Sequence, residues 1–220
     1  FLADGMRQTL KKAAEKWVVA VISGRDLKTI QNFVQLDNLY FAGSHGFDIA
    51  GPAGLNLDMQ KGADFLPVLD IARKRLEETL SDIPGAAIEP KKFSIAIHYR
   101  NVKQAQASSV KEAVRQVQTD HKELRITEGK KVFELQPDID WHKGKALNWL
   151  MEKLKLDRET YYPMYMGDDI TDEDAFEALK KIGTSIVVKG SFHPTSADYT
   201  LENPRETAAF LENLFDEKER

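Results

Sequence analysis

The sequence has 220 residues, which is enough for one large domain or two small ones. Its 31 basic and 35 acidic residues leave a net charge of −4 without an extended basic run, which argues against nucleic acid as the main partner. The absence of cysteine excludes disulfides, thiolate nucleophiles and thiolate zinc sites. No apolar run approaches the roughly 18 residues of a membrane span, and no secretory signal opens the sequence. We therefore expect a cytoplasmic protein without a membrane partner.

The first part of the chain alternates helix-like and strand-like segments. Residues 5–16 have the apolar spacing of an amphipathic helix, and residues 17–22 are a continuous apolar run. Such a run predicts a strand buried on both faces, as in a parallel sheet. A helix from Asp26 to about Val34 and a short strand at 39–42 follow, so this region predicts right-handed βαβ units.

The pattern changes in the middle of the chain, where two pairs of strands alternate with two helices. The predicted elements are a helix at 63–80, strands at 86–89 and 93–100, a helix at 104–120, and a hairpin of strands at 124–127 and 132–135. This order predicts an α+β module with an antiparallel sheet.

After Pro137 the alternating pattern returns. The predicted elements are helices at 143–154, 172–181 and 204–217, and strands at 161–166, 184–188 and 198–201. The simplest architecture is an α/β fold whose core, residues 1–51 and 138–220, is interrupted by the inserted α+β module at 52–137.

Three polar segments follow predicted core strands or open core helices, and open α/β sheets place their chemistry at strand ends. In the first, Ser23, Gly24 and Arg25 separate a strand from a helix. A hydroxyl, a glycine that permits close backbone approach and free amides at a helix N-terminus suit a phosphate oxygen. An ordinary strand-to-helix turn with a polar cap explains the same residues.

The second segment, DDITD at 168–172, places three carboxylates within five residues. They repel one another unless a cation neutralises them, and Asp oxygens suit Mg²⁺. Helix capping by Thr171 and Asp174 is the alternative, but it does not account for Asp168 and Asp169. The segment therefore favours a magnesium site.

The third segment, WHKGK at 141–145, puts two lysines at the start of a predicted helix, where cations are disfavoured. A lysine aimed at a phosphate or at a carboxylate cluster would explain this placement. Two solvated surface lysines explain it equally well.

The middle module carries a polar sheet face of its own. Along residues 93–100, Ser94, Ala96, His98 and Arg100 alternate with apolar residues and share one face. In the hairpin, Glu134 likewise points away from the apolar side. These side chains suit sugar hydroxyls or an anion, and a solvated sheet face explains them as well.

Taken together and in this order, four stretches resemble the trehalose-6-phosphate phosphatase family of the haloacid dehalogenase superfamily. They are VVAVISGRDL at 18–27, GSHGFDI at 43–49, VFELQPDIDWHKGKAL at 132–147 and MGDDITDEDAF at 166–176. The resemblance covers essentially the whole chain. It implies a Rossmann-like α/β core with an inserted cap, trehalose 6-phosphate as the substrate, Mg²⁺ as the cofactor and a trehalose-phosphate synthase as a candidate partner.

The resemblance also implies a role for individual residues. Ser23 is similar to the hydroxyl that holds the transferring phosphoryl group, and Lys143 to the lysine of the third family motif. Asp168 is similar to the Mg²⁺ ligand, and Asp172 to the companion carboxylate that fixes the metal shell. The implied substrate-side residues are Gly24, Arg25, His45 and Gly46 in the core, and His98, Arg100 and Glu134 in the cap.

The family's first motif, Asp-x-Asp-Gly-Thr, does not occur in these 220 residues. Its first Asp is the nucleophile that becomes aspartyl-phosphate, so we expect the nucleophile on a strand upstream of Phe1 and no turnover by these residues alone. Two alternatives stay open. One is another sugar phosphatase of the superfamily, acting on sucrose phosphate or a glycosylglycerate phosphate. The other is a catalytically inactive sugar-phosphate-binding domain.

Overall fold

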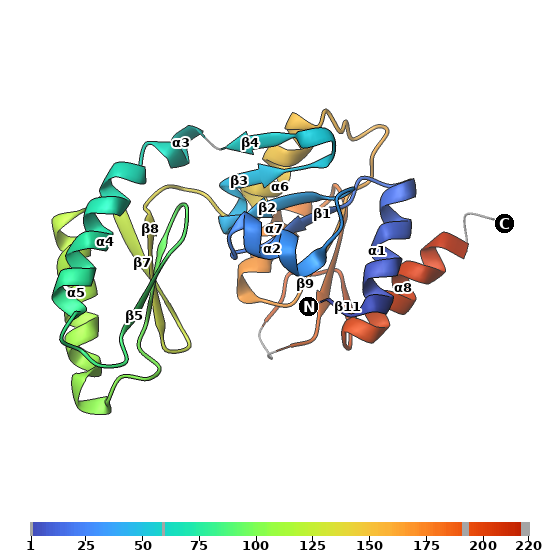
Figure 1. Cartoon of the computed structure of the whole chain (residues 1–220). Coiled ribbons are helices and arrows are strands. Elements are labelled where there is room, and N and C mark those ends of the chain that lie inside the picture. The colour runs from blue at the N-terminus through green and yellow to red at the C-terminus, as the bar shows by residue number, and fades with distance from the viewer. Residues whose placement is uncertain (1, 59, 191–193, 217–220) are drawn as a thin grey trace. The chain divides into compact units, whose positions relative to one another are not determined.

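The computed structural model describes residues 2–58, 60–190 and 194–216, and the chain divides into two compact units (Figure 1). One unit consists of Phe1–Leu57 and Trp141–Arg220, and we call it the core. The other is Asp58–Asp140, and we call it the cap.

The core alternates helices and strands before and after the cap. Its helices are α1 (Asp4–Lys16), α2 (Leu27–Val34), α6 (Lys143–Lys153), α7 (Glu173–Leu179) and α8 (Pro204–Asp216). Its strands are β1 (Ala20–Ile22), β2 (Tyr40–Gly43), β3 (Asp48–Ala50), β4 (Asn56–Asp58), β9 (Met164–Gly167), β10 (Thr184–Val188) and β11 (Tyr199–Leu201). β1 pairs in parallel with β2 across α2, and β9 pairs in parallel with β10 across α7. These pairs confirm the predicted parallel βαβ arrangement.

Helices pack on both faces of β2, whose successive side chains point to opposite faces. Phe41 lies in an apolar cluster with Ile30 of α2. Its neighbour Ala42 points the other way and lies in a cluster with Leu150 of α6. This three-layer packing is typical of α/β proteins.

β1 and β9 each lie at one edge of a core sheet. β1 ends the sheet of order β1-β2-β3-β4, and β9 ends the sheet of order β11-β10-β9. Ile22 of β1 packs against the cluster that contains Tyr165 of β9 and Phe176 of α7. The two sheets therefore share a hydrophobic core.

The strand predicted at 17–22 differs from the one observed. β1 contains only Ala20–Ile22, with Ala20 exposed and Val18 42% exposed, so the prediction of burial on both faces is wrong. One edge of β1 also has no strand partner among the described residues. Trp17 ends α1 and stacks on Phe215 of α8, with 5.0 Å between ring centroids.

The cap contains the predicted antiparallel sheet, and its helices lie on one face of that sheet. Its elements are α3 (Gln60–Ala63), α4 (Leu66–Leu80), α5 (Ala107–Asp120), β5 (Ala87–Pro90), β6 (Ile95–His98), β7 (Leu124–Gly129) and β8 (Val132–Pro137). The strand order is β5-β6-β8-β7, and every neighbouring pair is antiparallel. Figure 1 shows α4 and α5 side by side over this sheet, where Leu76, Ile97, Val114 and Leu135 belong to one apolar cluster.

Some details differ from the sequence prediction. The short strands β3 and β4 are not predicted, since three residues are too few for an alternating pattern to show. β6 ends at His98, so Arg100 lies in the following turn rather than on the strand. Within the described part of the chain, no helix combines the length and the apolar character needed to cross a membrane.

Candidate active site

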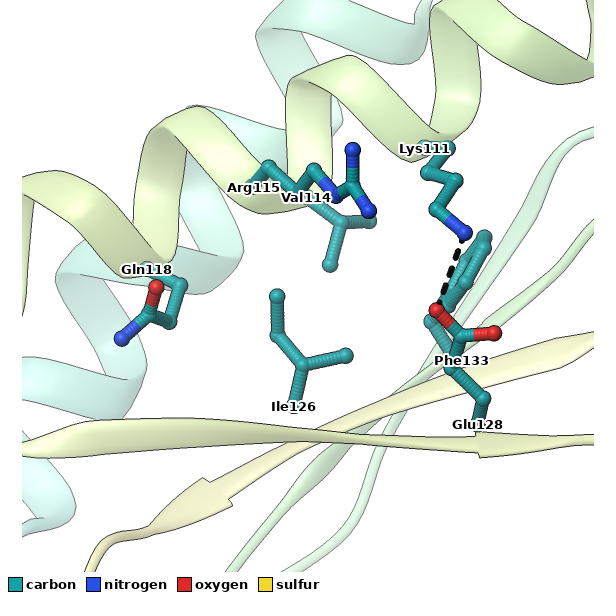
Figure 2. A pocket seen from close by; sticks show the side chains of 7 residues that line it. All are labelled: Lys111, Val114, Arg115, Gln118, Ile126, Glu128 and Phe133. Atoms are coloured by element: carbon teal, nitrogen blue, oxygen red, sulfur yellow. Dashed lines mark ion pairs between the residues drawn. The ribbon is translucent and has the colours of Figure 1, made fainter.

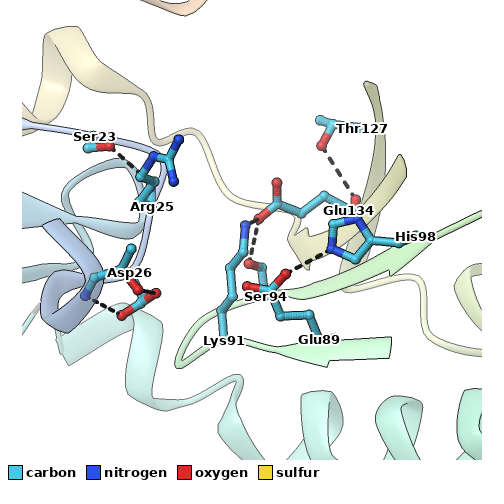
Figure 3. A network of polar contacts seen from close by, with 10 residues as sticks. Ser23, Arg25, Asp26, Glu89, Lys91, Ser94, His98, Thr127 and Glu134 are labelled. Carbon is cyan, nitrogen blue, oxygen red and sulfur yellow. Dashed lines mark hydrogen bonds and ion pairs between the residues drawn. The ribbon is translucent and has the colours of Figure 1, made fainter. Parts of the chain in front are cut away.

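The connection from β1 to α2 carries Ser23, and the loop after β2 fixes its backbone. The Ser23 N–H donates to the Ala42 carbonyl at 2.9 Å, and the Ser23 carbonyl accepts the His45 N–H at 2.8 Å. The Ser44 N–H donates to the Arg25 carbonyl at 2.7 Å. The Ser23 hydroxyl accepts the Arg25 N–H at 3.1 Å, as Figure 3 shows. The hydroxyl is therefore held at the end of β1, while Arg25 itself is exposed.

The loop after β2 is strained and closely packed. Ser44, His45 and Gly46 have φ angles of 51°, 58° and 96°, a left-handed run that non-glycine residues rarely adopt. A β-carbon on Gly24 would lie 2.6 Å from the His45 ring, and one on Gly46 would lie 2.3 Å from Cβ of Ala146 in α6. These two glycines therefore permit the Ser23 connection, the His45 loop and α6 to pack together.

The first residue of α6, Lys143, forms a buried ion pair with Asp172. Lys143 Nζ lies 2.7 Å from Asp172 Oδ1, and the two side chains are 8% and 5% exposed. The Tyr165 hydroxyl donates to the same oxygen at 2.7 Å. Asp172 Oδ2 accepts the N–H groups of Asp168 and Asp169 at 3.1 and 3.0 Å. Both oxygens of Asp172 are thus engaged by protein donors, so this carboxylate anchors Lys143 and the loop after β9.

Tyr165 belongs to this network but is not singled out by the sequence, because nothing in the run at 161–166 shows which tyrosine faces Asp172. Burial and the negative charge of Asp172 raise the pKa of the Tyr165 hydroxyl above its ordinary value. The hydroxyl therefore stays protonated and acts as a donor.

The capping alternative holds for other residues than those expected: the capping box joins Asp169 and Asp172 rather than Thr171 and Asp174. The reason is that Asp172 reaches back to the strand end, where a β-carbon on Gly167 would lie 2.3 Å from its Cγ. Capping thus accounts for Asp169, contrary to the prediction from the sequence, but not for Asp168.

Asp168 follows β9 and differs from Asp172. It is exposed, and its carboxylate makes no hydrogen bond or ion pair with any other described residue. Such a carboxylate fits Mg²⁺, which proteins hold with one or two carboxylates together with water and substrate phosphate. No group of three His, Asp or Glu residues within the described ranges is arranged to hold a metal ion by itself. Asp168 is therefore a candidate metal ligand.

The core thus brings together most of the residues predicted for its site. The Trp141 indole N–H donates to the His45 carbonyl at 3.1 Å, which ties the start of α6 to the loop after β2. Lys143 is the first residue of α6, so this contact connects the His45 loop, and with it the β1–α2 connection that carries Ser23, to the hydrogen-bond network of Lys143 and Asp172. All of these segments lie within one compact unit.

In the cap, Glu134 is the centre of a second polar group (Figure 3). Its Oε1 accepts Lys91 Nζ at 2.9 Å and the Ser94 hydroxyl at 2.6 Å. The side chains of Lys91 and Glu134 are 16% and 21% exposed. Lys91 is not predicted as a site residue, because it lies 43 positions from Glu134 and only the pairing of β6 with β8 brings the two segments together.

The other two cap residues predicted from the sequence have different partners. His98 Nε2 lies 2.8 Å from Glu89 Oε2 on the neighbouring strand β5. The Arg100 guanidinium donates to the Lys130 carbonyl at 3.3 Å from the turn after β6. By strand register His98 shares the sheet face of Glu134, whereas Arg100 does not continue that strand.

The sequence matches the model of one protein family, described as trehalose-phosphatase, over residues 1–205. The chain belongs to the trehalose-phosphatase family. It is 41% identical over 230 residues to a protein named probable trehalose-phosphate phosphatase E of Arabidopsis thaliana. The alignment covers all of this chain and 65% of that protein. The chain spans about two thirds of the length of the curated relatives that it matches.

Solved structures of similar fold support the architecture of this trehalose-phosphatase family member. A trehalose-6-phosphate phosphatase related protein has a TM-score of 0.82 at 21% identity, over 100% of this chain and 91% of that one. A haloacid dehalogenase-like hydrolase from Bacteroides thetaiotaomicron has a TM-score of 0.69 at 15% identity, over 97% and 93% of the two chains. The predicted α/β fold of the haloacid dehalogenase type is therefore confirmed.

Proposed function

We propose that this chain is the phosphatase region of an Mg²⁺-dependent enzyme that hydrolyses trehalose 6-phosphate to trehalose and inorganic phosphate. The observation that carries the proposal is the buried Lys143–Asp172 pair beside the exposed carboxylate of Asp168, in a chain of the trehalose-phosphatase family. A fixed cation next to a free carboxylate suits a phosphate monoester together with a divalent metal ion.

The core side chains supply what phosphoryl transfer needs. The Ser23 hydroxyl and the amides that follow it suit the non-bridging phosphate oxygens. The Lys143 ammonium has three N–H donors, one of which Asp172 takes among the described residues, and we assign the others to the same phosphate. Because Asp172, which also accepts the Tyr165 hydroxyl, holds Lys143 in advance, the lysine charge stabilises the transition state without reorganisation. When bound by Asp168, Mg²⁺ would neutralise part of the phosphate charge.

We infer that the nucleophile is a carboxylate on a strand outside these 220 residues. Ser23 and Asp168 follow β1 and β9, which are the end strands of their sheets, so a further strand at one of these edges would end near them. Its Asp would attack phosphorus while the sugar oxygen leaves with a proton from a general acid. Water would then hydrolyse the acyl phosphate and restore the carboxylate. Residues 1–220 alone should therefore release no phosphate.

In the cap, Glu134, Lys91 and Ser94 support the recognition of sugar hydroxyls. The carboxylate accepts hydrogen bonds while the ammonium and the hydroxyl donate them, and all three lie on one sheet face with His98. We assign Glu134 and His98 to substrate binding, with Arg25, His45, Gly24 and Gly46 on the core side and Arg100 beside the cap sheet. We also propose that the enzyme works in the cytoplasm beside a trehalose-phosphate synthase that supplies its substrate.

Phosphate release by the complete native protein tests this function and separates it from its alternatives. We expect turnover of trehalose 6-phosphate that EDTA abolishes, with kcat/KM at least about tenfold above that for sucrose 6-phosphate or glucosylglycerate phosphate. Equal turnover of sucrose 6-phosphate would overturn the substrate assignment. Tight binding of trehalose 6-phosphate without any turnover would instead establish an inactive binding domain.

A further inference from the structure

The cap contains a pocket on the helix-covered face of its sheet. It has a volume of about 240 Å³ and lies between α5 and the strands β7 and β8. Helix α5 contributes Lys111, Val114, Arg115 and Gln118, and the strands contribute Ile126, Glu128 and Phe133 (Figure 2). Neighbouring residues of a strand point to opposite faces. The pocket, on the face of Phe133, is therefore separated by the sheet from the polar group around Glu134.

The pocket has an apolar wall that is built into the cap. Val114 and Phe133 are 1% and 3% exposed and belong to the cap's apolar cluster, against which Ile126 packs. In Figure 2, Val114 and Ile126 point toward each other from the helix and the strand. This wall can hold the hydrocarbon part of a ligand.

The charged residues of the pocket leave one cation without a counter-charge. Lys111 Nζ lies 3.1 Å from Glu128 Oε1 and 6.0 Å from the centroid of the Phe133 ring. Arg115 is exposed and makes no hydrogen bond or ion pair with any residue that the structure describes. Gln118 is oriented by a hydrogen bond from its Nε2 to the Leu124 carbonyl at 3.2 Å. The lining therefore combines an apolar wall with one uncompensated guanidinium.

We propose that this pocket binds a small monocarboxylate of about ten non-hydrogen atoms that has an apolar body. The planar guanidinium of Arg115 matches a carboxylate with two parallel hydrogen bonds, and the apolar body packs between Val114, Ile126 and Phe133. The apolar wall favours such a ligand over a bare inorganic anion, which cannot use it. This site does not depend on the phosphatase function proposed above.

Benzoate is a suitable probe, with benzamide as its uncharged counterpart and inorganic phosphate as the anion without an apolar body. In ¹⁵N–¹H NMR titrations of the full chain, we expect benzoate to shift the backbone amides of Arg115, Gln118 and Ile126 with a Kd on the order of 1 mM. Arg115→Gln should weaken this binding about tenfold. Arg75→Gln on α4, a second exposed arginine of the cap, is the matched control and should leave it unchanged.

The titrations decide the proposal in either direction. Binding of benzoate that is about tenfold weaker in Arg115→Gln, together with no binding of benzamide, supports it. Equal affinity of the wild type and Arg115→Gln for benzoate overturns the role of the guanidinium. Equal shifts with inorganic phosphate overturn the role of the apolar wall, and no shifts up to saturating benzoate overturn the site.

Discussion

Each unit of the molecule contains a lysine–carboxylate pair, and the two pairs are built differently. In the core, Lys143 and Asp172 are 8% and 5% exposed, and four protein donors engage Asp172. In the cap, Lys91 and Glu134 are 16% and 21% exposed. The core pair is therefore a fixed charge arrangement, whereas the cap pair keeps oxygen and nitrogen atoms that a ligand can reach.

This difference has an energetic consequence. Removing one partner of a buried pair leaves an uncompensated charge in the interior, which costs far more than removing one partner of an exposed pair. The core pair should therefore tolerate substitution poorly in both stability and activity. The cap pair should show its effect mainly in substrate binding.

The largest effect is expected for Lys143→Met, which leaves Asp172 buried without its cation. We expect the free energy of unfolding to fall by about 3–5 kcal/mol, as measured by urea denaturation of the native protein. Lys189→Met is the matched control, because Lys189 pairs with Glu202 at the surface, with side chains 58% and 62% exposed. Lys189→Met should lower the free energy of unfolding by no more than about 1 kcal/mol. Similar losses in both variants would contradict the assigned difference between buried and exposed pairs.

A smaller effect is expected for Glu134→Gln in the cap. The change removes the charge that Lys91 and Ser94 contact, so we expect KM for trehalose 6-phosphate to rise about tenfold with kcat changed far less. Steady-state kinetics of phosphate release measures both constants. Glu112→Gln, on the exposed side of α5, should leave both unchanged. A fall in kcat with an unchanged KM would instead place Glu134 at the reacting phosphate.

The smallest effect is expected for Tyr165→Phe, which removes one donor to Asp172. At pH 8 it should cost about 1 kcal/mol of unfolding free energy, whereas Tyr162→Phe, at a side chain 70% exposed, should cost less. Because folding raises the pKa of Tyr165, its contribution is complete below its ordinary pKa of about 10 and is lost as the pH rises above that value.

The stability difference between the wild type and Tyr165→Phe should therefore shrink between pH 8 and pH 10.5. Urea denaturation at the two pH values measures this difference in the free energy of unfolding. The same measurement on Tyr162→Phe serves as the control for pH effects that come from other side chains. A difference that stays constant would contradict the assigned role of the Tyr165 hydroxyl as a protonated donor.

Much of the fold could be predicted from the sequence, because its signals are local. The apolar runs, the turn residues and the alternation along residues 93–100 show the α/β core and the antiparallel cap. Ser23 and Asp168 are predicted as site residues because chemistry at strand ends leaves polar residues next to apolar runs. Lys143 is predicted because a lysine at the start of a helix is unusual.

The rest depends on contacts between distant segments. Nothing near Glu134 indicates that Lys91 and Ser94 are its partners, since only the pairing of β6 with β8 brings them together. Likewise, the positive φ angles of Ser44 and His45 arise from the packing of their loop on α6 and on Gly24. Arg100 was misplaced because the alternating pattern continues beyond His98, where the strand ends.

The most direct test of the proposed phosphatase site is the activity of Asp168→Asn in the complete native protein. Asp168 is the exposed carboxylate that follows β9, and its replacement should lower kcat/KM for trehalose 6-phosphate at least ~100-fold and weaken the dependence on Mg²⁺. Asp37→Asn, at an exposed core position that precedes β2 rather than following a strand, should retain wild-type activity. Wild-type turnover and an unchanged Mg²⁺ requirement in Asp168→Asn would contradict the assignment.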